Sequence, residues 1–140
     1  MANVLYSAGK EAFLSAEINL SSAANNIAIV LVDTDDYSFS DSHTVLNDIT
    51  GASRVATATL ASKTVTSGVF DAADATFSNV TGDQAEALII YHDVKVGGVT
   101  EANSCTLIAY IDTATGLPIT PGGGDITVAF SDGANKIFAL

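Results

Sequence analysis

The stretch IAIVLV at Ile27–Val32 is an uninterrupted run of apolar residues, most of them β-branched. A second run, ALIIY at Ala87–Tyr91, has the same character. Continuous apolar runs of this length are typical of strands in the middle of a sheet that is covered on both faces. We therefore expect both segments to be central strands around which the rest of the chain folds.

Shorter segments have the pattern of half-buried strands. TFSNV at Thr76–Val80 and ITVAF at Ile126–Phe130 alternate apolar with small or polar residues, which predicts one buried and one solvent-facing side. Gly, Asn and Asp residues between the segments, as at Val96-Gly97-Gly98, are typical of turns. Besides Ile27–Val32, strands are predicted at about Arg54–Leu60, Lys63–Thr66, Val69–Phe70, Ala75–Val80, Ala85–Asp93, Cys105–Asp112, Asp125–Phe130 and Lys136–Leu140.

This series of strands predicts a mainly β fold, a β-sandwich or jelly-roll-like single domain over residues 1–140. One short N-terminal helix is predicted at about residues 6–17, with Ser7 as its cap. We expect Phe13 and Leu14 to dock this helix on the rest of the domain.

The charge of the chain is strongly acidic. It has 16 Asp and Glu residues against 5 Lys and Arg residues, a formal net charge of −11. Such a field repels phosphate, which argues against nucleic acid and anionic membranes as partners. The N-terminus lacks the basic stretch and apolar core of a secretory signal, and no run approaches the roughly 18 apolar residues of a membrane span. We expect the protein to be made in the cytoplasm.

The residues that could carry chemistry are scattered. His43 and His92 are separated from each other and from metal-ligand spacings, and no G-x-S-x-G elbow for a serine nucleophile is present. Cys105, the one cysteine, follows Ser104 and begins an apolar run, which favours a buried and unreactive thiol. We therefore predict no catalytic and no cofactor-binding residues.

The acidic cluster from Asp33 to Asp41 contains the best candidate ligands for a Ca²⁺ site. It lacks the glycine and the twelfth-position glutamate of an EF-hand loop, since Thr44 occupies that position. The prediction is therefore an acidic, solvated loop and no metal site. Paired carboxylates for glycoside hydrolysis stay possible, although the absence of Trp and an aromatic content of 7% disfavour a sugar-binding cleft.

Three parts of the sequence carry a resemblance to a known group: LYSAGKEAFL at Leu5–Leu14, LVDT at Leu31–Thr34, and the closing stretch Leu107–Leu140. Together they resemble small structural proteins encoded in the virion modules of tailed phages. The resemblance implies a head decoration or cement protein, which sits on the capsid surface of the virion as a homotrimer and binds the major capsid protein. A neck, tail or fibre-associated component is the alternative, and a carbohydrate- or receptor-binding module is a further one.

The two ends of the chain are the expected contact segments, because they are apolar although the middle already supplies a core. Burying them against other copies or the shell would contribute roughly 25 cal/mol per Å². The predicted protein-interaction residues are Leu5, Tyr6, Phe13, Leu14, Ile137, Phe138 and Leu140.

Overall fold

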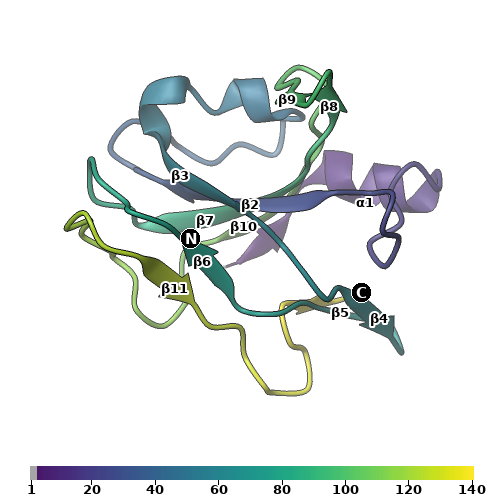
Figure 1. The fold of residues 1–140 in the computed structure, drawn as a ribbon. Coiled ribbons are helices and arrows are strands. Elements are labelled where there is room, and N and C mark those ends of the chain that lie inside the picture. Colours follow the sequence, from purple (N-terminus) through teal and green to yellow (C-terminus); the bar gives the residue numbers. More distant parts are fainter. Residues whose placement is uncertain (1–2) are drawn as a thin grey trace.

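The two apolar runs lie side by side in a five-stranded antiparallel sheet (Figure 1) in the computed structural model, which describes residues 3–140. β2 (Ile27–Val32) pairs with β7 (Ala87–His92) so that Ile29 faces Ile90 and Leu31 faces Leu88. Every residue of β2 is buried, and in β7 only His92 is not. The sheet order is β1 (Val4–Leu5), β10 (Leu107–Ile111), β7 (Ala87–His92), β2 (Ile27–Val32) and β3 (Arg54–Thr59).

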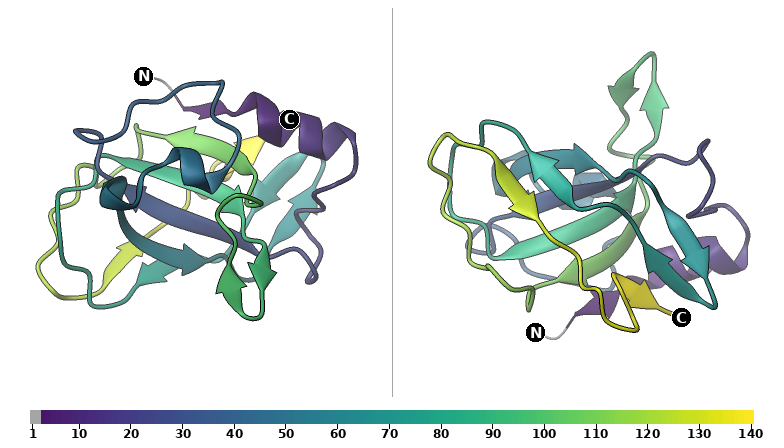
Figure 2. Two further views of the ribbon diagram at one scale, coloured as in Figure 1. Left: turned by 90° about the horizontal axis from the view of Figure 1, so that it is seen from above. Right: turned by 60° about the horizontal axis from the view of Figure 1, so that its bottom comes forward.

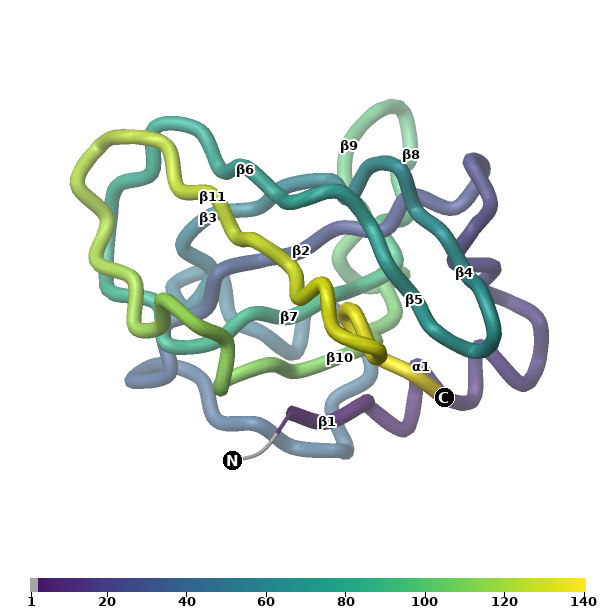
Figure 3. The backbone as a smooth tube through the Cα atoms, turned by 90° about the horizontal axis from the view of Figure 1, so that it is seen from below, coloured from purple at the N-terminus to yellow at the C-terminus, as the bar shows by residue number. Residues whose placement is uncertain are grey.

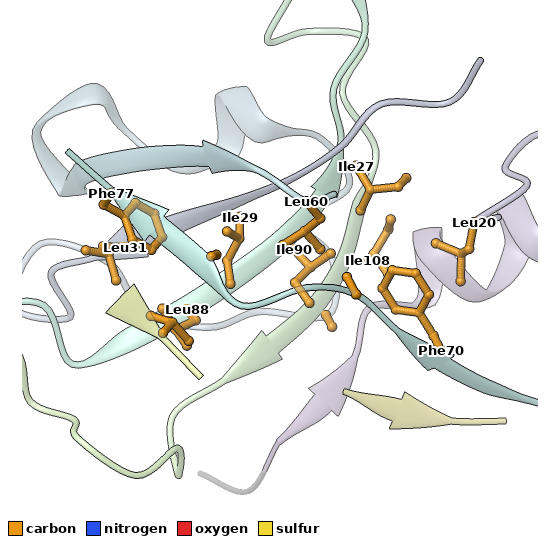
Figure 4. Close-up of a cluster of buried hydrophobic side chains, with 14 of the residues drawn as sticks. Leu20, Ile27, Ile29, Leu31, Leu60, Phe70, Phe77, Leu88, Ile90 and Ile108 are labelled. Carbon is orange, nitrogen blue, oxygen red and sulfur yellow. The ribbon is translucent and has the colours of Figure 1, made fainter. Parts of the chain in front are cut away.

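Two short antiparallel sheets form a second layer against one face of the main sheet, as Figures 2 and 3 show from different sides. The core between the layers contains Ile29, Leu31, Ile90, Phe70 and Phe77, drawn in Figure 4. The mainly β prediction is confirmed, with two layers of unequal size. The second layer consists of β6 (Ala75–Phe77) with β11 (Ile126–Val128), and of β12 (Phe138–Ala139), β5 (Val69–Asp71) and β4 (Thr64–Thr66).

The opposite face of the main sheet is covered by segment 33–53, which contains the 3₁₀ turns η1 (Leu46–Asp48) and η2 (Gly51–Ser53). Tyr37, Leu46 and Ile49 pack there against residues of β2 and β7 that point away from the first core. Successive residues of a strand point to opposite faces. The two central runs are continuously apolar because each of them serves both cores, as predicted.

The N-terminal helix is shorter than predicted. α1 spans Ser7–Leu14, and Ala16 has a φ of 61°, a left-handed conformation that stops the helix. Ser7 is not the cap; Tyr6 holds that position without a side-chain hydrogen bond. Instead, the carboxylate of Asp41 accepts hydrogen bonds from the Ser7 backbone N–H (2.8 Å) and hydroxyl (2.5 Å). Asp41, in segment 33–53, therefore supplies the capping hydrogen bonds at the start of α1 that were expected from Ser7.

A hairpin of β8 (Lys95–Val96) and β9 (Val99–Thr100) stands out from the body (Figure 2). Gly97 and Gly98 form its turn, with φ values of 60° and 82°. The sequence predicted the turn but not the two strands. It also missed β1, and it made the strands at Ala75–Val80, Asp125–Phe130 and Lys136–Leu140 longer than they are.

Candidate interaction surface

The two ends of the chain meet on one side of the molecule. Phe13 of α1 stacks on Phe138 of β12, with ring centroids 6.3 Å apart, and Phe138 contacts Phe70 of β5 at 5.3 Å. β1 and α1 both pack on β10. We call the surface formed by Lys10, Phe13, Leu14, Val65 and Leu140 the terminal face.

The seven predicted interaction residues differ in their exposure. Tyr6 is fully buried, so its side chain cannot contact a partner of the folded chain. A second set is half-buried against the core and consists of Leu5, Phe13, Ile137 and Phe138. Leu14 is 90% exposed and Leu140 is 71% exposed. The expectation that Leu14 docks the helix is therefore wrong, whereas Phe13 does dock it.

Open cavities adjoin the exposed leucines. One, of about 260 Å³, is lined by Lys10, Phe13, Leu14 and Leu140. A second, of about 390 Å³, shares Phe13 and Leu140 and extends to Val65, which is 48% exposed. Exposed apolar groups next to hollows of this size are features of protein contact sites. Val65 and Lys10 were not predicted, because in sequence they lie in a polar hairpin and on the outer face of a helix.

A second concave region, which we call the edge groove, runs between the open edge of the main sheet and the C-terminal segment. It joins cavities of about 190 and 370 Å³. The strands β1 and β12 border it, and within residues 3–140 each is paired on one side only. Its apolar lining includes Leu5, Ile111, Val128, Phe130, Ile137 and Phe138.

A chain of polar groups, buried at Tyr6 and Tyr37 and half-buried at His43, fixes α1 to segment 33–53. The Tyr37 hydroxyl lies 2.9 Å from the Tyr6 hydroxyl and 2.9 Å from Nδ1 of His43. Burial raises the pKa of both tyrosines. The ring of Phe39 contacts Tyr6 and Tyr110 at centroid distances of 5.0 and 5.2 Å. This cluster holds the start of the helix, and hence the terminal face, in a defined position.

The candidate chemical groups have structural partners. The Asp33 carboxylate accepts a hydrogen bond from the Asp35 backbone N–H at 2.8 Å, and the Asp41 carboxylate caps α1. The two ends of the acidic loop therefore bind different parts of the chain. Over residues 3–140, no three His, Cys, Asp or Glu side chains converge as a metal site would require. His92 is half-buried, which lowers its pKa. Cys105 is buried as predicted, and burial raises the pKa of its thiol.

The hairpin tip is a further exposed apolar feature, with Val96 67% and Val99 69% exposed. The sequence predicts only a turn at this position. The Gly-Gly pair between two valines is, however, the two-residue turn signal of a β-hairpin, and this signal could have found it.

Neither the models of known protein families nor the curated proteins compared with this chain match it. Within residues 3–140, no helix has the length and apolar character needed to span a membrane.

Proposed function

We propose that the protein is a non-enzymatic structural protein of a phage virion, a capsid decoration or cement protein that binds the major capsid protein as a homotrimer. The terminal face carries the proposal, because it exposes Leu14 and Leu140 beside apolar cavities in an otherwise acidic chain. The resemblance of Leu5–Leu14 and Leu107–Leu140 to virion proteins supports the same role.

The physical case rests on the cost of leaving leucines in water. Burial of a leucine side chain contributes about 1.5–3 kcal/mol, so two leucines seated in a partner contribute about 3–6 kcal/mol. The face is also held rigidly: Phe13 packs on Phe138, and α1 is tied to segment 33–53 through Asp41. Rigid, preformed surfaces lose little entropy on binding.

The test uses Leu14→Asp/Leu140→Asp, which places charges on the terminal face without touching the cores. We expect this variant to lose at least about 100-fold in affinity for undecorated phage heads, measured by co-sedimentation, because about 3 kcal/mol or more is lost. The matched control is Ala52→Asp/Thr81→Asp, which adds the same charge at exposed positions outside the terminal face and should bind like the original.

Circular dichroism checks that both variants are folded. Failure of the unmodified protein to bind heads, together with its appearance in the tail density of a particle map, would contradict the decoration role and favour the neck or tail alternative. Equal binding of both variants to the heads would show that the terminal face does not contact the capsid.

A further inference from the structure

The β8–β9 hairpin presents two unlike faces. Val96 and Val99 pair directly across the turn, and Lys95 pairs with Thr100. Paired residues share a face and successive residues alternate, so the two valines lie on one face and Lys95 with Thr100 on the other. The valines are about two-thirds exposed.

The polar face is attached to the body through Asp93, which is only 5% exposed. Its carboxylate accepts a hydrogen bond from the Thr100 hydroxyl at 2.8 Å and forms an ion pair with Lys95 at 3.4 Å. The sulfur of Cys105 accepts the Val94 backbone N–H at 3.2 Å. A free two-stranded ribbon is marginally stable in water, and these contacts hold this one with its apolar face outward.

The hairpin and the edge groove lie on opposite sides of the molecule. In both views of Figure 2 and in Figure 3, the hairpin projects on the side away from β1 and β12, which border the groove. The groove offers apolar side chains, two strand edges, and cavities of about 190 and 370 Å³, far above the roughly 30 Å³ of one water.

Charge favours this hairpin as the occupant of that groove. Lys95 of the hairpin is paired with Asp93, and Lys136, which lines the groove, is paired with Asp71 and Asp132. The cations at both surfaces are thus paired within each copy, so on a chain with a net charge of −11 these are surfaces that two copies can bring together with little repulsion.

We propose that the β8–β9 hairpin of one copy binds the edge groove of a second copy, head to tail. Val96 and Val99 enter the groove, and the open strand edges of β1 or β12 are available to the ribbon backbone. Because the two surfaces differ, the contact is heterologous and each added copy leaves a hairpin and a groove free until a ring closes. The contact goes beyond the proposed capsid role, since it needs only this chain.

The test mixes two variants that each lack one half of the contact. Val96→Asp/Val99→Asp disables the hairpin, and Ala129→Asp/Ala139→Asp disables the groove at exposed alanines that line it. Val65→Asp/Ala52→Asp carries the same added charge outside both surfaces. All are examined by sedimentation velocity at about 100 μM in about 0.3 M NaCl, where screening limits repulsion between copies.

The unmodified protein and the Val65→Asp/Ala52→Asp control should sediment as assemblies larger than a dimer. Each disabled variant alone should sediment as a monomer of 14.3 kDa. An equimolar mixture of the two should form a dimer and nothing larger, because one intact hairpin meets one intact groove. A monomeric unmodified protein, or a hairpin variant that still assembles, would overturn the proposal. Neither result bears on head binding through the terminal face, which the leucine variants test separately.

Discussion

Gly9 is the single residue that lets α1 approach the main sheet. A Cβ at this position would lie 2.8 Å from Cα of Ile108 and 2.9 Å from the carbonyl oxygen of Leu107. Both are backbone atoms of the β10 region, which cannot turn aside as a side chain can. We expect Gly9→Ala to lower the free energy of unfolding by about 1–3 kcal/mol despite the better helix propensity of alanine. Urea unfolding measures this change.

Gly51→Ala is the matched control, since a Cβ there meets nothing within 4 Å and no positive φ is involved. It should change the free energy of unfolding by less than about 0.5 kcal/mol. Equal effects of both substitutions would show that the approach of α1 to β10 is not limited by Gly9.

Tyr37 provides a second test at the residue scale. In Tyr37→Phe the fully buried Tyr6 hydroxyl loses its partner, which should cost about 1–3 kcal/mol in the free energy of unfolding. Tyr6→Phe/Tyr37→Phe should cost less than the sum of the single changes, because no hydroxyl is then left unpaired. Additive effects in chemical denaturation would argue against a coupled pair.

Asp41 joins two elements, α1 and segment 33–53, and makes their contact sensitive to acid. Hydrogen bonds from the Ser7 hydroxyl and backbone N–H lower the pKa of Asp41. Because the folded pKa lies below the unfolded one, the stabilisation is complete above the ordinary value near 3.9 and is lost as the pH falls through the folded pKa. In Asp41→Asn, the deficit in unfolding free energy should be largest at neutral pH and should shrink below about pH 4.

Urea unfolding at several pH values between about 7 and 2.5 measures this deficit. Asp36→Asn changes an exposed aspartate of the same segment and should give a deficit near zero at each pH. A deficit for Asp41→Asn that persists at the acid end would show that the carboxylate charge is not what matters.

At the scale of elements, the sequence predicted best where local pattern and burial agree. The runs at β2 and β7 are apolar because both of their faces are covered. The residue range of each strand and its place in the middle of the sheet could therefore be predicted directly. The end of α1 depends on the left-handed conformation of Ala16, and its start on Asp41, more than 30 residues away. Such distant contacts leave no local signal.

The sequence predicted that both faces of the main sheet are covered, but not which residues cover the second face. Tyr37, Leu46 and Ile49 stand among polar residues without strand or helix periodicity, yet they pack on the second face of the main sheet. Of the terminal face, the sequence indicated Phe13, Leu14 and Leu140, and their role in contacts stays a prediction. The burial of Tyr6 and the exposure of Leu14 depend on how α1 lies on β10, which periodicity alone does not give.

For the whole molecule, charge sets the conditions of stability. A net charge of −11 on 140 residues produces self-repulsion that salt screens, since the Debye length falls from about 30 Å at 0.01 M to about 8 Å at 0.15 M. We expect the melting temperature to rise over this range of NaCl. Glu17→Gln/Asp36→Asn removes two exposed charges and should show a smaller rise. A melting temperature that does not depend on salt would contradict this expectation.

The position of Cys105 gives the molecule a built-in reporter. Its sulfur lies under the hairpin base, with no exposed surface, and contacts Val94 and the Glu101 carbonyl. A thiol reagent can reach it only when the hairpin base opens, so the modification rate measures how often that opening occurs. No label or engineered cysteine is needed. Seating the hairpin in a neighbouring copy should slow the reaction, and detachment of the hairpin could be timed in the unmodified protein.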